Sequence, residues 1–108
     1  MNILKKIILF STLFAVQAQA GFCTTNYCDA RIKLLYVHPN TNVYIQPEAD
    51  MTPLNCTLDN GSIVLKKSHE MHEEIYSALL STSMSDWTIR LRASDTGSCE
   101  LIYVQIRR

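Results

Sequence analysis

Four cysteines carry the clearest chemistry in this sequence of 108 residues. Cys23 and Cys28 lie five positions apart, whereas Cys56 and Cys99 are distant from them and from each other. An even number of cysteines in a small exported domain predicts a disulfide framework, and four cysteines allow three connectivities. We favour Cys23–Cys28 with Cys56–Cys99, because a local pair closes readily and leaves the two distant cysteines to each other.

A zinc site is the alternative use of the same cysteines. Structural zinc cysteines usually come as two close pairs, with about two to four residues between the ligands of a pair. Four residues separate Cys23 from Cys28, but the other two cysteines form no close pair. The spacing therefore favours disulfides, and we expect no metal ion and no cofactor.

The segment 68–74, SHEMHEE, is a second cluster of titratable side chains. A metalloprotease helix needs histidines at positions i and i+4, so that both face one metal, and a glutamate after the first histidine. His69 and His72 are three positions apart, and no third ligand follows nearby. A solvated first turn of a helix is the simpler interpretation of this segment.

The sequence lacks the common signals of covalent catalysis. It contains no G-x-S-x-G motif and no glycine-rich phosphate loop, and it has no free thiol if all four cysteines pair. His38 stands beside Pro39 in a predicted turn, and Asp86 and Asp95 also fit turns. We therefore predict that the protein is not an enzyme and that it acts by binding.

Arginine and tyrosine side chains supply a candidate binding face. Arg90 and Arg92 alternate on one side of a predicted strand, and Tyr44 and Tyr103 lie on other predicted strands. Together they would form a polar and aromatic platform for a glycan or an anionic partner. Ordinary solvated arginines on a sheet are the alternative interpretation of the same pattern.

Residues 1–20, MNILKKIILFSTLFAVQAQA, have the layout of a secretory signal peptide, with two lysines, an apolar run and a small-x-small site that ends at Ala20. The apolar run of about ten residues is shorter than the roughly 20 that span a bilayer as a helix. Phe22 precedes Cys23, where a lipid-modified cysteine would need a small residue. We expect cleavage after Ala20, a periplasmic or secreted product, and no stable membrane anchor.

The chain expected after cleavage is small and weakly acidic. Removal of 20 residues from 108 leaves 88, which suits one domain. Two of the ten Lys and Arg lie in the leader, so eight basic side chains remain against ten acidic ones, a formal net charge of −2. Nucleic-acid binding is disfavoured, because it needs a cationic surface.

Period-two patterns and turn residues predict six short strands after the leader. Asn60 and Gly61, between the third and fourth strands, are the clearest hairpin signal, because both residues tolerate positive φ. The predicted strands cover residues 30–37, 43–47, 54–58, 62–66, 87–93 and 99–106.

A helix is predicted over residues 66–84, between the fourth and fifth strands, with Ser68 as its N-cap. Glutamates in its early turns suit the positive end of a helix. Its core-facing residues are expected to be Met71, Ile75, Ala78 and Leu79. In the following strand, the residues expected on the buried side are Trp87, Ile89, Leu91 and Ala93.

These elements predict a β-rich α+β fold. The expected architecture is a small curved sheet or an OB-like barrel of five to six short strands, with the helix between the fourth and fifth predicted strands. The expected organisation is a signal peptide at 1–20, an amino-terminal segment with a local disulfide at 21–29, and a single β-rich domain at 30–108.

The series VYIQP, Cys56, EIYSALLSTSM, an arginine-containing strand, Cys99 and IYV resembles a loose group of short exported proteins of Gram-negative bacteria with no assigned activity. The resemblance covers about residues 30–106 and implies no catalytic residue. It implies a disulfide between Cys56 and Cys99. Cys23 and Cys28 depart from the common pattern of the group.

Two functions follow as hypotheses. The first is an exported non-enzymatic binding module for a protein or glycan partner. It could form a homo-oligomer like the OB-fold receptor-binding subunits of bacterial toxins, an analogy of fold alone. The second is a periplasmic inhibitor or accessory protein of another enzyme.

Overall fold

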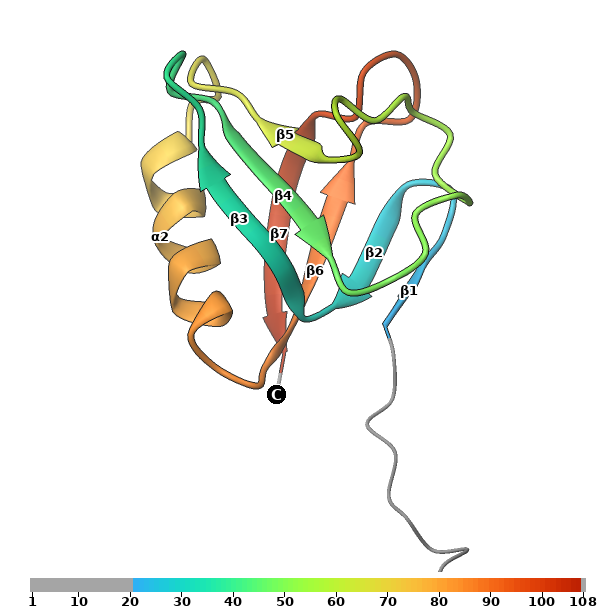
Figure 1. The fold of residues 1–108 in the computed structure, drawn as a ribbon, viewed down its shortest axis with the longest axis horizontal. Coiled ribbons are helices and arrows are strands. Elements are labelled where there is room, and N and C mark those ends of the chain that lie inside the picture. The colour runs from blue at the N-terminus through green and yellow to red at the C-terminus, as the bar shows by residue number, and fades with distance from the viewer. Residues whose placement is uncertain (1–20, 108) are drawn as a thin grey trace, which may run out of the picture.

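The computed structural model describes residues 21–107, and the predicted signal peptide lies outside these described residues. Residues 21–107 form seven strands and one helix (Figure 1). In chain order the elements are β1 (Phe22–Cys23), β2 (Tyr27–Ala30), β3 (Ile32–Val37), β4 (Val43–Pro47), β5 (Ile63–Leu65), α2 (His72–Ser83), β6 (Thr88–Ala93) and β7 (Leu101–Arg107).

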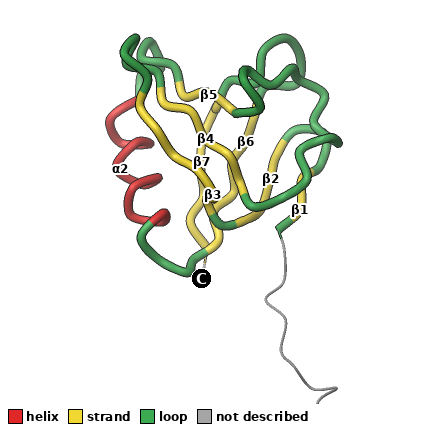
Figure 2. Tube along the Cα trace, viewed as in Figure 1, coloured by secondary structure: helices red, strands yellow, loops and turns green. Residues whose placement is uncertain are grey.

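The strands form two antiparallel sheets (Figure 2). The four-stranded sheet has the order β1-β2-β6-β7, and the three-stranded sheet has the order β3-β4-β5. In Figure 1, β4 crosses in front of β7, and buried apolar side chains from both sheets form one core. Helix α2 contacts β3 and β7, which are edge strands of the two sheets. It therefore covers the side of the molecule where these two edges lie.

This arrangement confirms the β-rich α+β class and corrects its details. The described residues contain seven strands instead of five or six, and the two sheets are not closed into a barrel. The isolated parallel bridge Val64↔Glu100 links β5 to the chain just before β7, and the bridge Thr57↔Ser98 links two loop segments beside it.

The predicted strand 30–37 is divided at Arg31. β2 ends at Ala30 and pairs with β6, whereas β3 begins at Ile32 and pairs with β4. Arg31 is exposed and carries the chain across the corner between the two sheets. The alternation of side chains continues through the corner, which is why the pattern alone indicates one strand.

The amino-terminal segment 21–29 is part of the four-stranded sheet. It supplies β1 and most of β2, and Cys28 pairs in register with Leu91 of β6. Cys28 is fully buried in the core. The boundary expected at residue 30 therefore falls at the end of a core strand.

The predicted strand 54–58 is wrong, because the segment forms only one isolated bridge, between Thr57 and Ser98, and Ser98 lies outside the strands. The Leu54 N–H donates to the carbonyl of Met51 at 3.1 Å, which closes a turn. The Thr57 N–H donates to the carbonyl of Gly97 at 2.7 Å, and the Thr57 carbonyl accepts from Cys99 at 2.8 Å. The apolar residues of this segment reflect a loop that packs on the core, not a paired strand.

The turn at Asn60 and Gly61 is confirmed. Both residues have positive φ, 52° and 73°, and Asp59 and Ser62 form the antiparallel bridge that closes the turn. Positive φ at both central positions is the geometry that favours Asn-Gly in tight hairpins. The predicted helix, by contrast, begins later than expected.

Helix α2 begins at His72, with Met71 as its N-cap and no side-chain cap bond, so Ser68 is not the cap. The chain before the helix makes two turns, in which His69 donates its N–H to the Lys66 carbonyl at 3.0 Å and His72 donates to the His69 carbonyl at 3.1 Å. These turns replace the first predicted helical residues.

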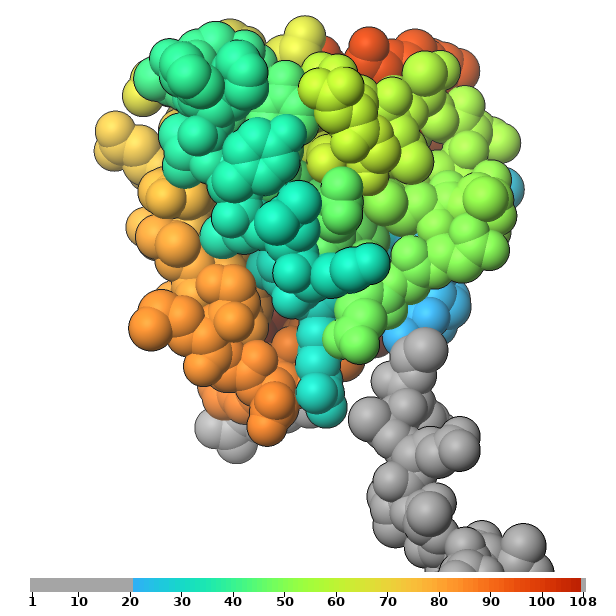
Figure 3. Space-filling model, in the orientation of Figure 1, coloured from blue at the N-terminus to red at the C-terminus, as the bar shows by residue number. Residues whose placement is uncertain are grey.

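The predicted faces of α2 and β6 contribute to the core, except that Ala78 is only partly buried and two further residues are exposed. Ile75 and Leu79 are buried as expected, and so are Ile89, Leu91 and Ala93. Two residues expected in the core are instead exposed, Met71 at 50% and Trp87 at 44%. Figure 3 shows the opposite side of the molecule from the four-stranded sheet, where side chains of β3 and β4 form one face and α2 adjoins it.

Both predicted disulfides are present. Cys23 is bonded to Cys28 and Cys56 is bonded to Cys99, which leaves no free cysteine among residues 21–107. The first bond joins facing residues of β1 and β2. The second fixes the loop that contains Cys56 to the chain just before β7.

Candidate functional site: the outer face of the four-stranded sheet

The candidate site is the side of the four-stranded sheet that points away from the core. Along β6, buried residues alternate with Thr88, Arg90 and Arg92. The strand register places Asp29 of β2 opposite Arg90 and Tyr103 of β7 opposite Arg92, so these residues lie on the same side of the sheet. We call this side the outer face; its members are Phe22, Tyr27, Asp29, Thr88, Arg90, Arg92, Tyr103, Gln105 and Arg107.

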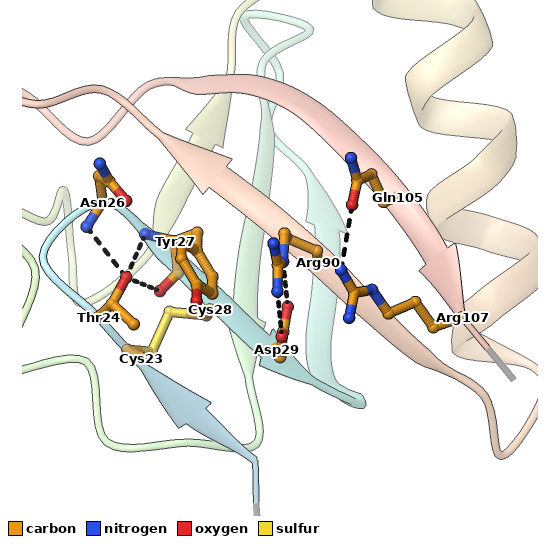
Figure 4. Close-up of polar contacts among 9 residues, drawn as sticks. All are labelled: Cys23, Thr24, Asn26, Tyr27, Cys28, Asp29, Arg90, Gln105 and Arg107. Carbon is orange, nitrogen blue, oxygen red and sulfur yellow. Dashed lines mark hydrogen bonds and ion pairs between the residues drawn. A yellow bond between two sulfur atoms is a disulfide. The ribbon is translucent and has the colours of Figure 1, made fainter.

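A bidentate ion pair occupies the centre of the outer face (Figure 4). Arg90 donates through Nε and Nη2 to the two carboxylate oxygens of Asp29, at 2.7 and 2.8 Å. The two side chains are 22% and 14% exposed, so the pair is partly shielded from water. The hydrogen bonds from Arg90 lower the pKa of Asp29, and partial burial opposes this effect only in part.

The same guanidinium fixes an aromatic ring. The Arg90 Cζ lies 4.0 Å from the centroid of the Tyr27 ring, which is a cation–π contact. The ring of Phe22 lies edge-on to Tyr27, with centroids 6.4 Å apart. Arg90 is therefore already engaged by Asp29 and Tyr27, and it serves as the scaffold of the face.

The turn between β1 and β2 adds rigidity to this scaffold. The Tyr27 N–H donates to Thr24 Oγ1 at 3.3 Å, and the Thr24 N–H donates to the Tyr27 carbonyl at 2.7 Å. The adjoining Cys23–Cys28 disulfide joins the same two strands (Figure 4). The turn and the disulfide together hold Tyr27 in a fixed place.

Other groups of the outer face are held loosely. Arg92, whose side chain is 24% exposed, makes hydrogen bonds of 3.3 and 3.4 Å to Asp95, whose side chain is 65% exposed. Arg107 donates to Gln105 at 3.4 Å, and Tyr103 is 43% exposed. Exposed ion pairs of this kind are worth little in water. Arg92, Arg107 and Tyr103 can therefore exchange their present contacts for contacts with a partner.

One end of the outer face is hollowed. The hollow has a volume of about 390 Å³, within the usual range for small-molecule sites. Four of its lining residues, Phe22, Asp29, Thr88 and Arg107, belong to the outer face. The remaining lining residues are Gly21, Ala30, Arg31, Glu48 and Asp86.

Tyr44, a predicted member of the binding face, lies elsewhere. It belongs to β4 of the three-stranded sheet and is 5% exposed. Its hydroxyl donates to Asp59 at 3.1 Å, and its ring stacks on Tyr36 at 5.0 Å. Burial and the neighbouring Asp59 carboxylate raise the pKa of Tyr44. Its contacts tie together β3, β4 and the turn before β5.

The structure thus brings Arg90, Arg92 and Tyr103 together and separates Tyr44 from them. Six further members of the face were not predicted as binding residues: Phe22, Tyr27, Asp29, Thr88, Gln105 and Arg107. The alternation of 27–30 could have revealed Tyr27 and Asp29, but those residues precede the predicted strand.

The two histidines of segment 68–74 make structural contacts. His69 bonds through Nε2 to the carbonyl of Ile102 at 2.7 Å and accepts at Nδ1 the N–H of Met71 at 3.0 Å. His72 bonds through Nδ1 to the carbonyl of Lys66 at 3.0 Å. In the described part of the chain, no three His, Cys, Asp or Glu side chains are grouped so that they could hold a metal ion.

Comparison with protein-family models finds no match, and comparisons with curated proteins and with solved structures find no significant match. Over residues 21–107, no helix has the length and apolar character needed to cross a membrane.

Proposed function

We propose that this chain is an exported, non-enzymatic binding module that contacts an anionic partner through its outer face. The observation that carries this proposal is the arrangement around Arg90. Arg90 is held in place by its ion pair with Asp29 and its cation–π contact with Tyr27. The loosely held groups around it are available for contact.

The charges of the outer face favour a partner with negative groups. Its strand residues include three arginines and one aspartate, and Asp29 compensates only Arg90. Arg92 is paired only with the exposed Asp95, and Arg107 forms no ion pair among residues 21–107. Guanidinium groups bind carboxylates in a planar bidentate manner. The chain as a whole carries two more acidic than basic side chains after the predicted cleavage, so this local positive charge is a property of the face.

The aromatic content favours a glycan over a protein. Tyr103 and Phe22, 43% and 53% exposed, each offer a ring beside polar groups, which suits stacking against a sugar ring. The centre of a protein–protein interface usually has a larger, more apolar core. We therefore assign the partner as an acidic glycan, and we treat an acidic protein as the competing result.

The strand connectivity supports an OB-like arrangement as part of this proposal. If the bent β2–β3 counts as one strand, five strands remain besides β1, and α2 lies between the third and fourth of them. The parallel bridge Val64↔Glu100 links β5 to the start of β7. OB folds are partly open Greek-key barrels that bind oligosaccharides and oligonucleotides.

The two disulfides favour an oxidising compartment and therefore support export. The periplasm and the exterior of the cell both fit this chemistry.

The test is binding of the oxidised chain to arrays of sialylated and uronate-containing glycans, with matched neutral glycans beside them. We expect binding to the acidic glycans that weakens with salt. Arg92→Ser and Tyr103→Ser should each weaken it at least about tenfold, the effect of losing roughly 1.4 kcal/mol from a central contact. Lys33→Ser, on the exposed side of β3, is the matched control and should change nothing.

Two results would redirect the proposal. Equal binding to acidic and neutral glycans, or no effect of either substitution, would remove the outer face as the site. Recovery of an exported enzyme with the protein from envelope extracts, together with a monomer by light scattering, would favour the inhibitor or accessory role. A ring-sized oligomer would favour the toxin-like binding module.

A further inference from the structure

Gly21 is packed so closely that no larger residue fits at its position. A Cβ built on Gly21 would lie 2.2 Å from the Cβ of Ala30 and 2.5 Å from the carbonyl oxygen of Asp29. Both contacts involve β2, which is held on its other side by β6. The backbone of Gly21 therefore packs directly against β2 of the four-stranded sheet.

The nitrogen of Gly21 has a defined partner. It donates to the carbonyl of Glu48 at 3.2 Å, and the Glu48 N–H donates to the carbonyl of Arg31 at 2.8 Å. Glu48 is thus fixed between the end of β4 and the corner at Arg31. Gly21 and Glu48 both line the hollow at the end of the outer face.

One carboxylate that lines this hollow has no ion pair. Its lining has three carboxylates, those of Asp29, Glu48 and Asp86, and two guanidinium groups, those of Arg31 and Arg107. Asp29 pairs with Arg90, and Asp86 pairs with Arg31 at 3.6 Å. Among residues 21–107, no basic side chain forms an ion pair with Glu48.

We infer that Gly21 is the amino-terminal residue of the mature protein and that its α-ammonium group docks in this hollow beside Glu48. A signal peptidase hydrolyses the Ala20–Gly21 bond with one water, which leaves a carboxylate on Ala20 and an ammonium group on Gly21. The neutral amide nitrogen that contacts the Glu48 carbonyl thereby becomes a cation. It keeps that contact and places a positive charge beside Glu48, the carboxylate of the lining that has no ion pair.

This docking makes processing a stabilising step. The α-amino group ordinarily has a pKa of about 7.7–8.0. Stabilisation of the ammonium form by the docking requires that its pKa in the folded state lie above this value. The stabilisation is therefore fully present below about pH 7.7 and is lost as the pH rises through the folded-state pKa.

The first test is the mass of the chain recovered after export of the full-length protein. We expect a chain that begins at Gly21. A recovered chain that begins at another residue, or that retains Met1, would overturn the inference.

The second test compares two oxidised forms of chain 21–108, one with a free amino terminus and one acetylated on that nitrogen. At pH 6.5 the free form should have a folding equilibrium constant about three- to fivefold larger, as for a partly exposed ion pair. At pH 9.5 the difference should disappear. Glu48→Gln should abolish the difference at pH 6.5, whereas Glu74→Gln, on the exposed surface of α2, should preserve it.

Gly21→Ala provides an independent check of the steric argument. The added methyl group cannot fit against Ala30, so the terminus should leave the hollow and the effect of acetylation should vanish. An acetylation effect that persists in this variant, or in Glu48→Gln, would refute the docking. Both results are independent of glycan binding, so failure of this inference and failure of the proposed function are distinguishable.

Discussion

The two disulfides should contribute unequally to stability. Cys56 and Cys99 are separated by 43 positions and Cys23 and Cys28 by five. In the chain-entropy model a disulfide stabilises by restricting the unfolded chain, and the effect grows with the logarithm of the loop length. The model gives about 4 kcal/mol for the longer loop and about 2 kcal/mol for the shorter one.

Packing does not reverse this order. Each disulfide contributes at least one almost completely buried sulfur, since Cys28 is 0% exposed and Cys99 is 1% exposed. Replacement of either pair by alanine therefore removes a similar amount of core volume. The longer disulfide additionally fixes the loop around Cys56, which has only one isolated bridge, between Thr57 and Ser98. Replacing Cys56 and Cys99 together should cost roughly 2 kcal/mol more than replacing Cys23 and Cys28.

The assay is urea unfolding of the two double-alanine variants and the parent chain, all without reductant. The midpoint of the Cys56→Ala, Cys99→Ala variant should be the lowest of the three. Peptide mapping of each variant should confirm that the remaining disulfide is intact. Equal losses of stability, or a larger loss for the Cys23→Ala, Cys28→Ala variant, would refute the reasoning from loop length.

Two further predictions concern the helix and the ion pair. Leu79→Ala should lower the free energy of unfolding by about 2–5 kcal/mol in urea, because this fully buried leucine lies in the core face of α2; a loss below about half a kcal/mol would contradict that position. Because the pKa of Asp29 is lowered in the folded state, its pair with Arg90 should stabilise the protein above about pH 4, with the benefit lost as the pH falls through the folded-state pKa. NMR titration should show the Asp29 pKa moving up in Arg90→Gln and staying unchanged in Lys33→Ser, and an unmoved pKa in Arg90→Gln would show that another group sets it.

Local features of this fold could be predicted from the sequence. Asn60 and Gly61 need only their own backbone preferences to form a turn, and Cys23 and Cys28 need only a short loop to meet. The buried side of β6 follows from alternation alone. These features depend on residues that are close in sequence, so a single sequence contains the necessary information.

Features that depend on distant partners could not be predicted in the same way. The start of α2 is set partly by His69, which reaches the carbonyl of Ile102, 33 positions later. The corner at Arg31 moves β3 into a different sheet from β2, which separates Tyr44 from Arg90. Alternation indicates which side of a strand a residue occupies, but it does not indicate to which sheet the strand belongs.

The pairing of β2 with β6 has a consequence for the order in which the bonds of this protein can form. Asp29 of β2 and Arg90 of β6 are 61 positions apart. When a chain enters an oxidising compartment amino terminus first, β2 therefore arrives well before β6 and cannot pair until β6 has entered. Cys23 and Cys28 enter before Cys56 and can oxidise with each other while no other cysteine is present. Cys56 then meets only Cys99 as a free thiol. Vectorial entry and the native connectivity therefore coincide, and correct pairing would need little help from a disulfide isomerase.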